Sequence, residues 1–134
     1  MADILIIDDE KAIRKTLSEI LSFEGYRIDE ASDGEEGLKK FRERNYDVVL
    51  CDIKMPKIDG IEFLQRAGES NPDIPVIMLS SQDKIDVAIN CMHHRAFDYV
   101  VKSETAFMRL QKIITTIFQY QKMEKELNWY MERM

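Results

Sequence analysis

The chain has 134 residues, of which 45% are hydrophobic and 33% are charged, and its formal net charge is −6. This balance is that of an ordinary globular protein, and the length suits one domain with its own core. An acidic chain repels phosphate backbones, so we expect no direct binding to nucleic acid, and no apolar run reaches the roughly 18 residues of a membrane span.

Five stretches of the chain have the composition of strands. Residues 4–7 (ILII), 47–52 and 74–81 are nearly continuous apolar runs, which are typical of strands buried on both faces of a parallel sheet. Residues 26–31 and 97–102 predict two weaker strands. The sequence therefore predicts five strands in one sheet.

Helical spacing of apolar residues fills the segments between the strands. The first helix carries Leu17 and Leu21 and is expected to stop at Gly25, while the motif SDG at 32–34 is expected to cap the second. Asp83 is expected to cap a later helix in the same way. Five strands alternating with five helices predict an α/β fold with a doubly wound parallel sheet, and the order 2-1-3-4-5 would place the first and third strands side by side.

Polar side chains stand where the predicted strands end, which is where such sheets bind ligands. They are Asp8, Asp9, Asp52, Ser80, Ser81 and Lys102. Three neighbouring carboxylates repel one another, and a hard divalent cation such as Mg²⁺, which prefers oxygen ligands, removes that repulsion. A carboxylate nucleophile, an ammonium and a hydroxyl beside a metal ion form a receptacle for a phosphoryl group.

Four motifs in this order resemble the receiver domain of bacterial two-component response regulators. They are IIDDE (6–10), CDIKMPKIDG (51–60), VIMLSS (76–81) and AFDYVVK (96–102). The resemblance implies the flavodoxin-like version of this fold and runs from about residue 3 to about residue 122. We therefore expect a receiver domain over 1–122, followed by an extension of the last helix over 123–134.

The resemblance also implies roles for individual residues. Asp52 would take a phosphoryl group from a phosphohistidine of a sensor histidine kinase. Asp9, Asp52 and the backbone carbonyl of Lys54 would bind Mg²⁺ directly, and Asp8 would bind it through a water. Such a protein is a signalling switch and not an enzyme, apart from self-phosphorylation by phosphodonors and autodephosphorylation.

The remaining implied roles concern the phosphoryl group and the response to it. Ser80, Ser81 and Lys102 would contact the group, while Ser80 and Tyr99 would switch the surface formed by the last two helices and the strand between them. Lys54 and Gln82 occupy the positions that tune the phosphate lifetime in the family.

Two positions depart from the family pattern. Ser103 follows Lys102 where the family usually has proline, so the bond between them is expected to be trans or strained. Arg95 precedes Ala96 where glycine is frequent, and because arginine disfavours a left-handed cap, we expect the helix exit to differ there.

Other functional classes fit these residues less well. A flavin-binding protein of the same strand order needs a phosphate-cradling loop where the acidic stretch DDEKAIRK stands. Absence of colour in the purified protein would exclude flavin binding. An Mg²⁺-dependent aspartyl-phosphate hydrolase needs an acidic residue at the position of Lys54. Asp8 and Asp9 taken alone fit a helix cap, and a pseudo-receiver that only binds partners remains an alternative. His93 and His94 are expected at the surface without a metal role.

The two cysteines, Cys51 and Cys91, stand far apart and in no CxxC motif, which favours reduced, buried thiols in a cytoplasmic protein.

The end of the chain carries apolar residues at spacings of three and four. They are Ile113, Ile117, Tyr120, Met123, Leu127, Tyr130 and Met134. We expect one unbroken helix to near residue 131, because continuation of an existing helix avoids the cost of nucleation. The exposed part of this stripe is expected to mediate homodimer contact, the alternatives being a fold-back, a lead into an output domain and a frayed end.

Overall fold

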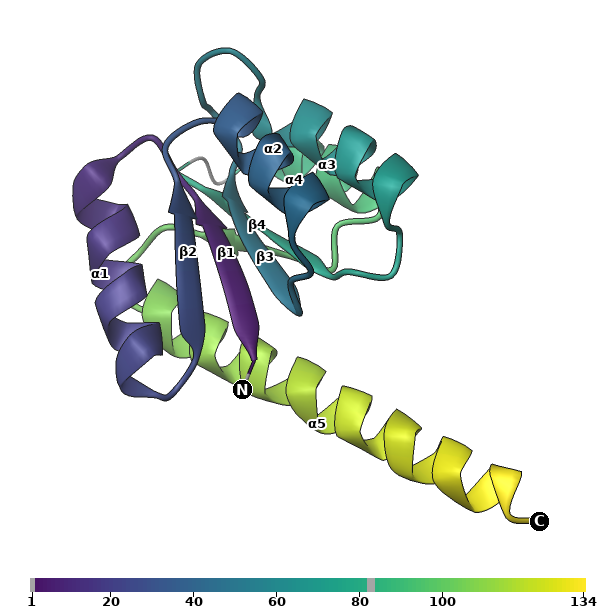
Figure 1. Ribbon diagram of the computed structural model, residues 1–134. Helices are drawn as coiled ribbons and strands as arrows, with labels where there is room; N and C mark the ends of the chain where they lie inside the picture. The colour runs from purple at the N-terminus through teal and green to yellow at the C-terminus, as the bar shows by residue number, and fades with distance from the viewer. Residues whose placement is uncertain (1, 82–83) are drawn as a thin grey trace. The chain divides into compact units, whose positions relative to one another are not determined.

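The computed structural model describes residues 2–81 and 84–134, along which strands and helices alternate (Figure 1). The strands are β1 (Asp3–Ile7), β2 (Arg27–Ala31), β3 (Val48–Asp52), β4 (Val76–Ser80) and β5 (Asp98–Val101). The helices are α1 (Lys11–Phe23), α2 (Gly34–Glu43), α3 (Gly60–Ser70), α4 (Ile85–His93) and α5 (Ala106–Glu132). The chain divides into two compact units, Met1–Ser103 and Glu104–Met134, so the sheet with α1–α4 and the helix α5 are described separately.

The five strands form one parallel sheet in the order β2-β1-β3-β4-β5, as predicted. Between the two central strands Ile4 pairs with Val48 and Ile7 pairs with Cys51. This register brings the residues that follow, Asp8 and Asp52, to the same edge of the sheet. Strand β1 begins one residue earlier than the sequence predicted, and the other four strands are shorter, because their flanking residues belong to the connecting loops.

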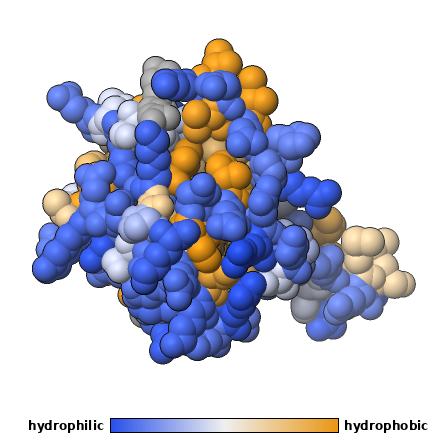
Figure 2. All heavy atoms as spheres, turned by 90° about the horizontal axis from the view of Figure 1, so that it is seen from above, coloured by the Kyte–Doolittle hydropathy of each residue, from blue (hydrophilic) through white to orange (hydrophobic). Residues whose placement is uncertain are grey.

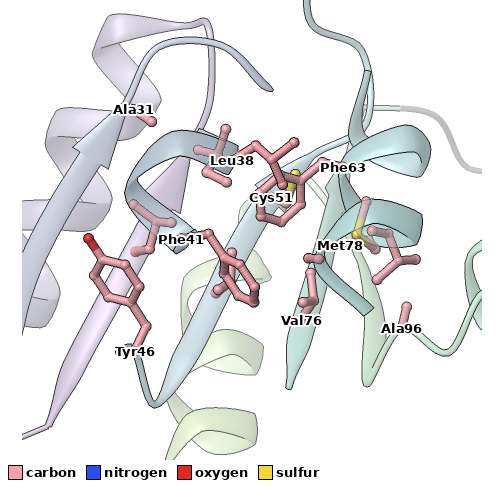
Figure 3. Close-up of a cluster of buried hydrophobic side chains, with 14 of the residues drawn as sticks. Ala31, Leu38, Phe41, Tyr46, Cys51, Phe63, Val76, Met78 and Ala96 are labelled. Carbon is pink, nitrogen blue, oxygen red and sulfur yellow. The ribbon is translucent and has the colours of Figure 1, made fainter. Parts of the chain in front are cut away.

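Alternate residues of the strands enter a core cluster on one face of the sheet, and Figure 3 shows a close-up of it. Leu5, Cys51 and Met78 point into this cluster, because side chains alternate between the two faces of a strand. Helices α2, α3 and α4 cover it, and Phe41 and Phe63 meet edge to face with ring centroids 5.8 Å apart. Both cysteines are buried and free, as predicted.

Helix α1 lies against β1 and β2 on the opposite face (Figure 1). Leu17 and Leu21, one helical turn apart, are its buried residues. Gly25 follows the helix with φ of 99°, a left-handed conformation that glycine adopts at little cost, so the predicted stop is confirmed.

The start of α2 is capped as the SDG motif predicted. The Asp33 carboxylate accepts a hydrogen bond of 2.8 Å from the backbone N–H of Glu36, and the Glu36 carboxylate accepts one of 2.9 Å from the Ser32 hydroxyl. The first of these bonds satisfies a backbone donor that the first turn of a helix leaves without a partner. The predicted cap at Asp83 lies outside the described residues, and Lys84, the residue before α4, makes no side-chain capping bond.

The exit of α4 contradicts the expectation from Arg95. This arginine itself adopts the left-handed conformation, with φ of 68°, so the chain keeps the turn and places a strained residue in it. The backbone N–H of Ala96 donates to the carbonyl of Cys91 at 3.1 Å and fixes the turn. No cis peptide bond occurs in the described part of the chain, so the bond between Lys102 and Ser103 is trans.

Helix α5 runs unbroken over 27 residues, which confirms the predicted continuous helix. Its buried residues are Ala106, Leu110, Ile114 and Ile117. Of the predicted stripe, Ile117 is buried and Ile113 is half-buried, whereas Ile114, which the stripe left out, is fully buried. The distal half is exposed, and there Trp129 packs edge to face on Tyr130 and under the Arg133 guanidinium.

Hydrophobic side chains also reach the surface outside α5. On α4, Ile85, Ile89 and Met92 follow one another at helical spacing and are 80%, 63% and 49% exposed. On the face that Figure 2 shows from above, hydrophobic residues form a band bordered by hydrophilic ones. Within the part of the chain that the structure describes, no helix combines the length and the apolar character needed to cross a membrane.

Candidate functional site

The carboxyl ends of β1, β3 and β5 bring three charged side chains together. The Lys102 ammonium lies 3.0 Å from Oδ2 of Asp8 and 3.3 Å from Oδ1 of Asp52. Asp8 is 0% exposed and Asp52 is 5% exposed, so both carboxylates belong to the protein interior. Because the three residues are distant in sequence, the order and register of the strands create this cluster.

Asp8 is held by its neighbours on both sides of the loop that follows β1. Its backbone N–H donates to the carbonyl of Ala31 at 3.1 Å, and its Oδ1 accepts a 2.9 Å bond from the backbone N–H of Glu10. Arg14 of α1 donates to the Asp8 carbonyl at 2.8 Å and also pairs with Glu30 at 3.1 Å. Asp8 therefore does not cap α1, and its second carboxylate oxygen remains turned toward Lys102.

Asp52 is fixed by the loop between β3 and α3. Its Oδ1 accepts a 2.9 Å bond from the backbone N–H of Ile53, whose carbonyl accepts a 2.7 Å bond from the N–H of Gly60. Gly60 sits so close that an added Cβ would lie 2.2 Å from the carbonyl oxygen of Asp52. The Asp52 backbone can therefore hold this position only because Gly60 has no side chain.

The electrostatics of the cluster follow from burial and crowding. Burial raises the pKa of Asp52, the negative charge of Asp8 raises it further, and Lys102 offsets part of the effect, which leaves the pKa at about 7. Burial alone would lower the pKa of Lys102, but its contacts with Asp8 and Asp52 outweigh this and raise it. Without a further cation, the site therefore holds more negative charge than Lys102 can balance.

The donor set of the site suits a hard cation. Carboxylate oxygens of Asp8, Glu10 and Asp52 lie within 4.8 Å of one another. Oδ2 of Asp8 and Nζ of Lys102 are buried atoms that have no hydrogen-bond partner of acceptable geometry among the described residues. A cluster of carboxylate oxygens whose negative charge exceeds that of Lys102 fits Mg²⁺.

Glu10 is the member of this cluster that sequence reasoning missed. Asp9, which the sequence placed among the metal ligands, is exposed and is not one of the three grouped carboxylates, but it lies beside them, because a hydrogen bond with its side chain contributes to raising the pKa of Asp52. The available signal was the run of three acids in IIDDE, because all three stand within three residues of the end of β1.

Of the other predicted site residues, Ser80, Ser81 and Lys54 lie at the same edge of the sheet or in the loops beside it, whereas Tyr99 is the second residue of β5. Ser80 ends β4 and is 3% exposed, and its carbonyl accepts a 2.7 Å bond from the N–H of Lys102. Tyr99 is half-buried and packs against the core cluster. Ser81 and Lys54 are exposed, and Gln82 lies outside the described residues.

The two histidines are away from this edge. His93 is exposed, whereas half-buried His94 makes a 2.7 Å hydrogen bond with Gln65 of α3 and another with the carbonyl of Asn90. Within the described ranges, 2–81 and 84–134, the acidic cluster is the one group of histidine, cysteine and acidic side chains arranged to hold a metal ion.

Residues 4–115 match the response regulator receiver domain family. The chain belongs to this family. This receiver is similar to the regulatory protein AtoC of Escherichia coli, with 35% identity over 124 residues, which is 92% of this chain and 27% of AtoC. The chain spans between 23% and 43% of the length of the curated relatives it matches here.

Solved receivers share the fold of this one. A receiver domain from Clostridium thermocellum superimposes with a TM-score of 0.84 at 35% identity, covering 92% of this chain and 98% of that one. The response regulator TrrA of Thermotoga maritima, solved in complex with Mg²⁺–BeF, gives a TM-score of 0.80 at 39% identity, covering 87% of this chain and 99% of that one.

Proposed function

We propose that this receiver accepts a phosphoryl group on Asp52 and transmits a signal through the change in its surface that follows. The observation that carries the proposal is the contact of 3.3 Å between the buried Asp52 carboxylate and the Lys102 ammonium, beside Asp8. This arrangement places a nucleophile next to a fixed positive charge, as phosphoryl transfer requires. The similarity to TrrA, which was solved with Mg²⁺–BeF, supports the same reading of the site.

The proposed reaction starts from a phosphohistidine of a sensor histidine kinase. An oxygen of the Asp52 carboxylate attacks phosphorus, the new O–P bond forms, and the P–N bond breaks with its electron pair returning to the imidazole. The product is an acyl phosphate on Asp52. Lys102 pairs with an oxygen of the transferred group as a point charge, and the Ser80 hydroxyl donates a hydrogen bond to it, with Ser81 beside them.

We propose that Mg²⁺ is bound directly by Asp9, Asp52 and the backbone carbonyl of Lys54, and through a water by Asp8. When bound, the ion neutralises charge on the carboxylates and on the phosphoryl oxygens. Because an ion that binds only the folded state stabilises it, Mg²⁺ at 100 times its dissociation constant should raise the free energy of unfolding by about 2.7 kcal/mol. A thermal melt should show this gain in the parent and lose it in Asp9→Ala.

The proposed output is a small shift between two states of the receiver. Ser80 turns toward the phosphoryl group, Tyr99 turns inward, and the surfaces of α4, β5 and α5 change for a downstream protein or output domain. Lys54 and Gln82 set the lifetime of the phosphate. The protein would work in the cytoplasm as a switch and not as a hydrolase, since Lys54 stands where a hydrolase needs an acid.

We further propose that residues 123–134 mediate homodimer contact, strengthened by phosphorylation. In this extension Met123, Leu127 and Tyr130 are about 60% exposed or more and recur at helical spacing. Sedimentation of 1–134 and of a 1–122 truncation, each with and without beryllofluoride, tests this. A monomer in all four samples at high micromolar concentration contradicts it.

The central test is the mass of the protein after incubation with acetyl phosphate and Mg²⁺. The parent should gain one phosphoryl group, and Asp52→Asn, which preserves shape but removes the nucleophile, should gain none. Asp73→Asn, in an exposed loop, is the matched control and should be labelled like the parent. Labelling of Asp52→Asn at the parental level would disprove the assignment of Asp52.

A further inference from the structure

Lys102 is shared by three carboxylates, and the third belongs to Glu10, at 3.5 Å from Nζ. We propose that Glu10 is a positioning residue that acts through Lys102: it holds the ammonium in the unphosphorylated domain and must release it before Lys102 can pair with a phosphoryl group. The inference rests on the proposed function and adds a residue that sets how readily the site accepts its anion.

The geometry distinguishes Glu10 from the other two carboxylates. The side chains of Asp8 and Asp52 are 0% and 7% exposed, whereas that of Glu10 is 57% exposed. A buried carboxylate that leaves its only cation remains in a low dielectric without a partner, which is costly, whereas an exposed one regains water. Of the three carboxylates, Glu10 is therefore the one that can separate from the Lys102 ammonium at the lowest cost in free energy.

Hydrogen bonds of the backbone around Glu10 fix the point from which its side chain reaches Lys102. The N–H of Glu10 donates to Oδ1 of Asp8 at 2.9 Å, and Arg14 holds the Asp8 carbonyl at 2.8 Å. The start of the Glu10 side chain is thus anchored to the pocket while its end reaches Lys102. Oδ2 of the buried Asp8 faces the same ammonium at 3.0 Å, so Glu10 and Asp8 meet Lys102 in one small space.

The size of the effect follows from the exposure of Glu10, whose side chain is 57% exposed beside the buried Lys102. Because water screens an ion pair with an exposed partner, loss of the contact should change affinity for a phosphoryl mimic by about twofold to fivefold. The residue would therefore adjust the affinity of the site for its anion and would not decide whether the anion binds.

The test compares the parent with Glu10→Gln, Glu10→Asp and Glu19→Gln by the affinity for beryllofluoride at saturating Mg²⁺, measured by fluorine NMR. Glu10→Gln removes the charge, whereas Glu10→Asp keeps it but is too short by one methylene to reach Lys102. Glu19→Gln makes the same charge change on an exposed position of α1. The nitrogen resonance of the Lys102 ammonium in metal-free protein gives a second, activity-independent measurement.

We expect both Glu10 variants to bind beryllofluoride about twofold to fivefold more tightly than the parent, and both to shift the Lys102 resonance, while Glu19→Gln does neither. Tighter binding in Glu10→Gln alone would mean that only the general field of the charge matters, which overturns the proposal. Parental affinity in both Glu10 variants overturns it too. If the parent itself binds beryllofluoride no better than Asp52→Asn, the proposed function fails, which is a separate result.

Discussion

The acidic pocket and the distal half of α5 both depart from the usual separation of polar surface and apolar core, but in opposite directions. The pocket buries the charges of Asp8 and Asp52, whereas the distal half of α5 exposes Met123 and Leu127. Pairing within the pocket offsets the cost of buried charge, and this pairing depends on the register of distant strands. Among the residues that the structure describes, no such pairing with distant strands involves the distal half of α5, which its own helical hydrogen bonds hold. Substitutions should therefore be severe near the pocket and in the buried half of α5, and mild in its distal half.

The largest expected difference lies within α5 itself. Leu110 is 2% exposed and Leu127 is 59% exposed, so the same change tests both halves of one helix. Leu110→Ala should lower the free energy of unfolding by about 2–5 kcal/mol, because it leaves a cavity, and Leu127→Ala should change it by less than about 0.5 kcal/mol. Urea unfolding at low micromolar concentration measures both. A large loss in Leu127→Ala would show that the distal half is packed in solution.

A substitution beneath the pocket should come next in size. Gly60→Ala places a methyl group 2.2 Å from the carbonyl oxygen of Asp52, so the loop must shift, at a cost of about 1–3 kcal/mol. The rate of phosphorylation by acetyl phosphate should fall as well. Gly68→Ala is the control on the same helix, because nothing lies within 4 Å of its added Cβ and alanine favours the helix by up to about 1 kcal/mol. Equal effects of the two changes would contradict the close packing at Gly60.

The charge in the pocket predicts a pH dependence in the absence of metal. The pKa of Asp52 is raised to about 7 in the fold, so its contribution to stability is complete below its unfolded pKa near 4 and is lost as pH rises through 7. Asp52→Asn stays neutral and should be more stable than the parent at pH 8 in EDTA, by about 1–2 kcal/mol. The difference should shrink toward pH 4. A constant difference across this range would argue against a crowded, buried carboxylate.

The smallest effect is expected at the exit of α4. Arg95 holds a left-handed conformation that costs about 1–2 kcal/mol for a residue with a side chain, whereas glycine adopts it freely but loses more entropy on folding. Arg95→Gly should therefore stabilise the fold by about 0.5 kcal/mol. Arg109→Gly, within the ordinary helical backbone of α5, should have the opposite sign and cost about 1 kcal/mol. Thermal unfolding of both variants checks the signs.

The arrangement of the strands could be predicted from the sequence, because acids and Lys102 stand at the ends of apolar runs and parallel strands end at one edge. The cap at Asp33 and the stop at Gly25 could be predicted too, since both depend on a local signal. The contact between Glu10 and Lys102 could not, because it depends on how far one flexible side chain reaches across the pocket.

The sequence also could not predict which residues of α5 face the core or that the turn at Arg95 is left-handed. Ile113 and Ile114 both fit a spacing of three or four, and only the surroundings decide that Ile114 is buried. At Arg95, the rest of the turn imposes a conformation that the residue itself disfavours. In both cases tertiary context overrides the local preference.

The burial of the two thiols has a practical consequence. Burial raises the pKa of Cys51, where the nearby Asp52 charge adds to the effect, and also that of Cys91. The thiolate, which is the form that reacts with maleimides and oxidants, is therefore scarce at both positions. A cysteine introduced at an exposed position of α4 or at the end of α5 should be labelled selectively, so spin or fluorescent probes can follow the receiver without removal of its native cysteines.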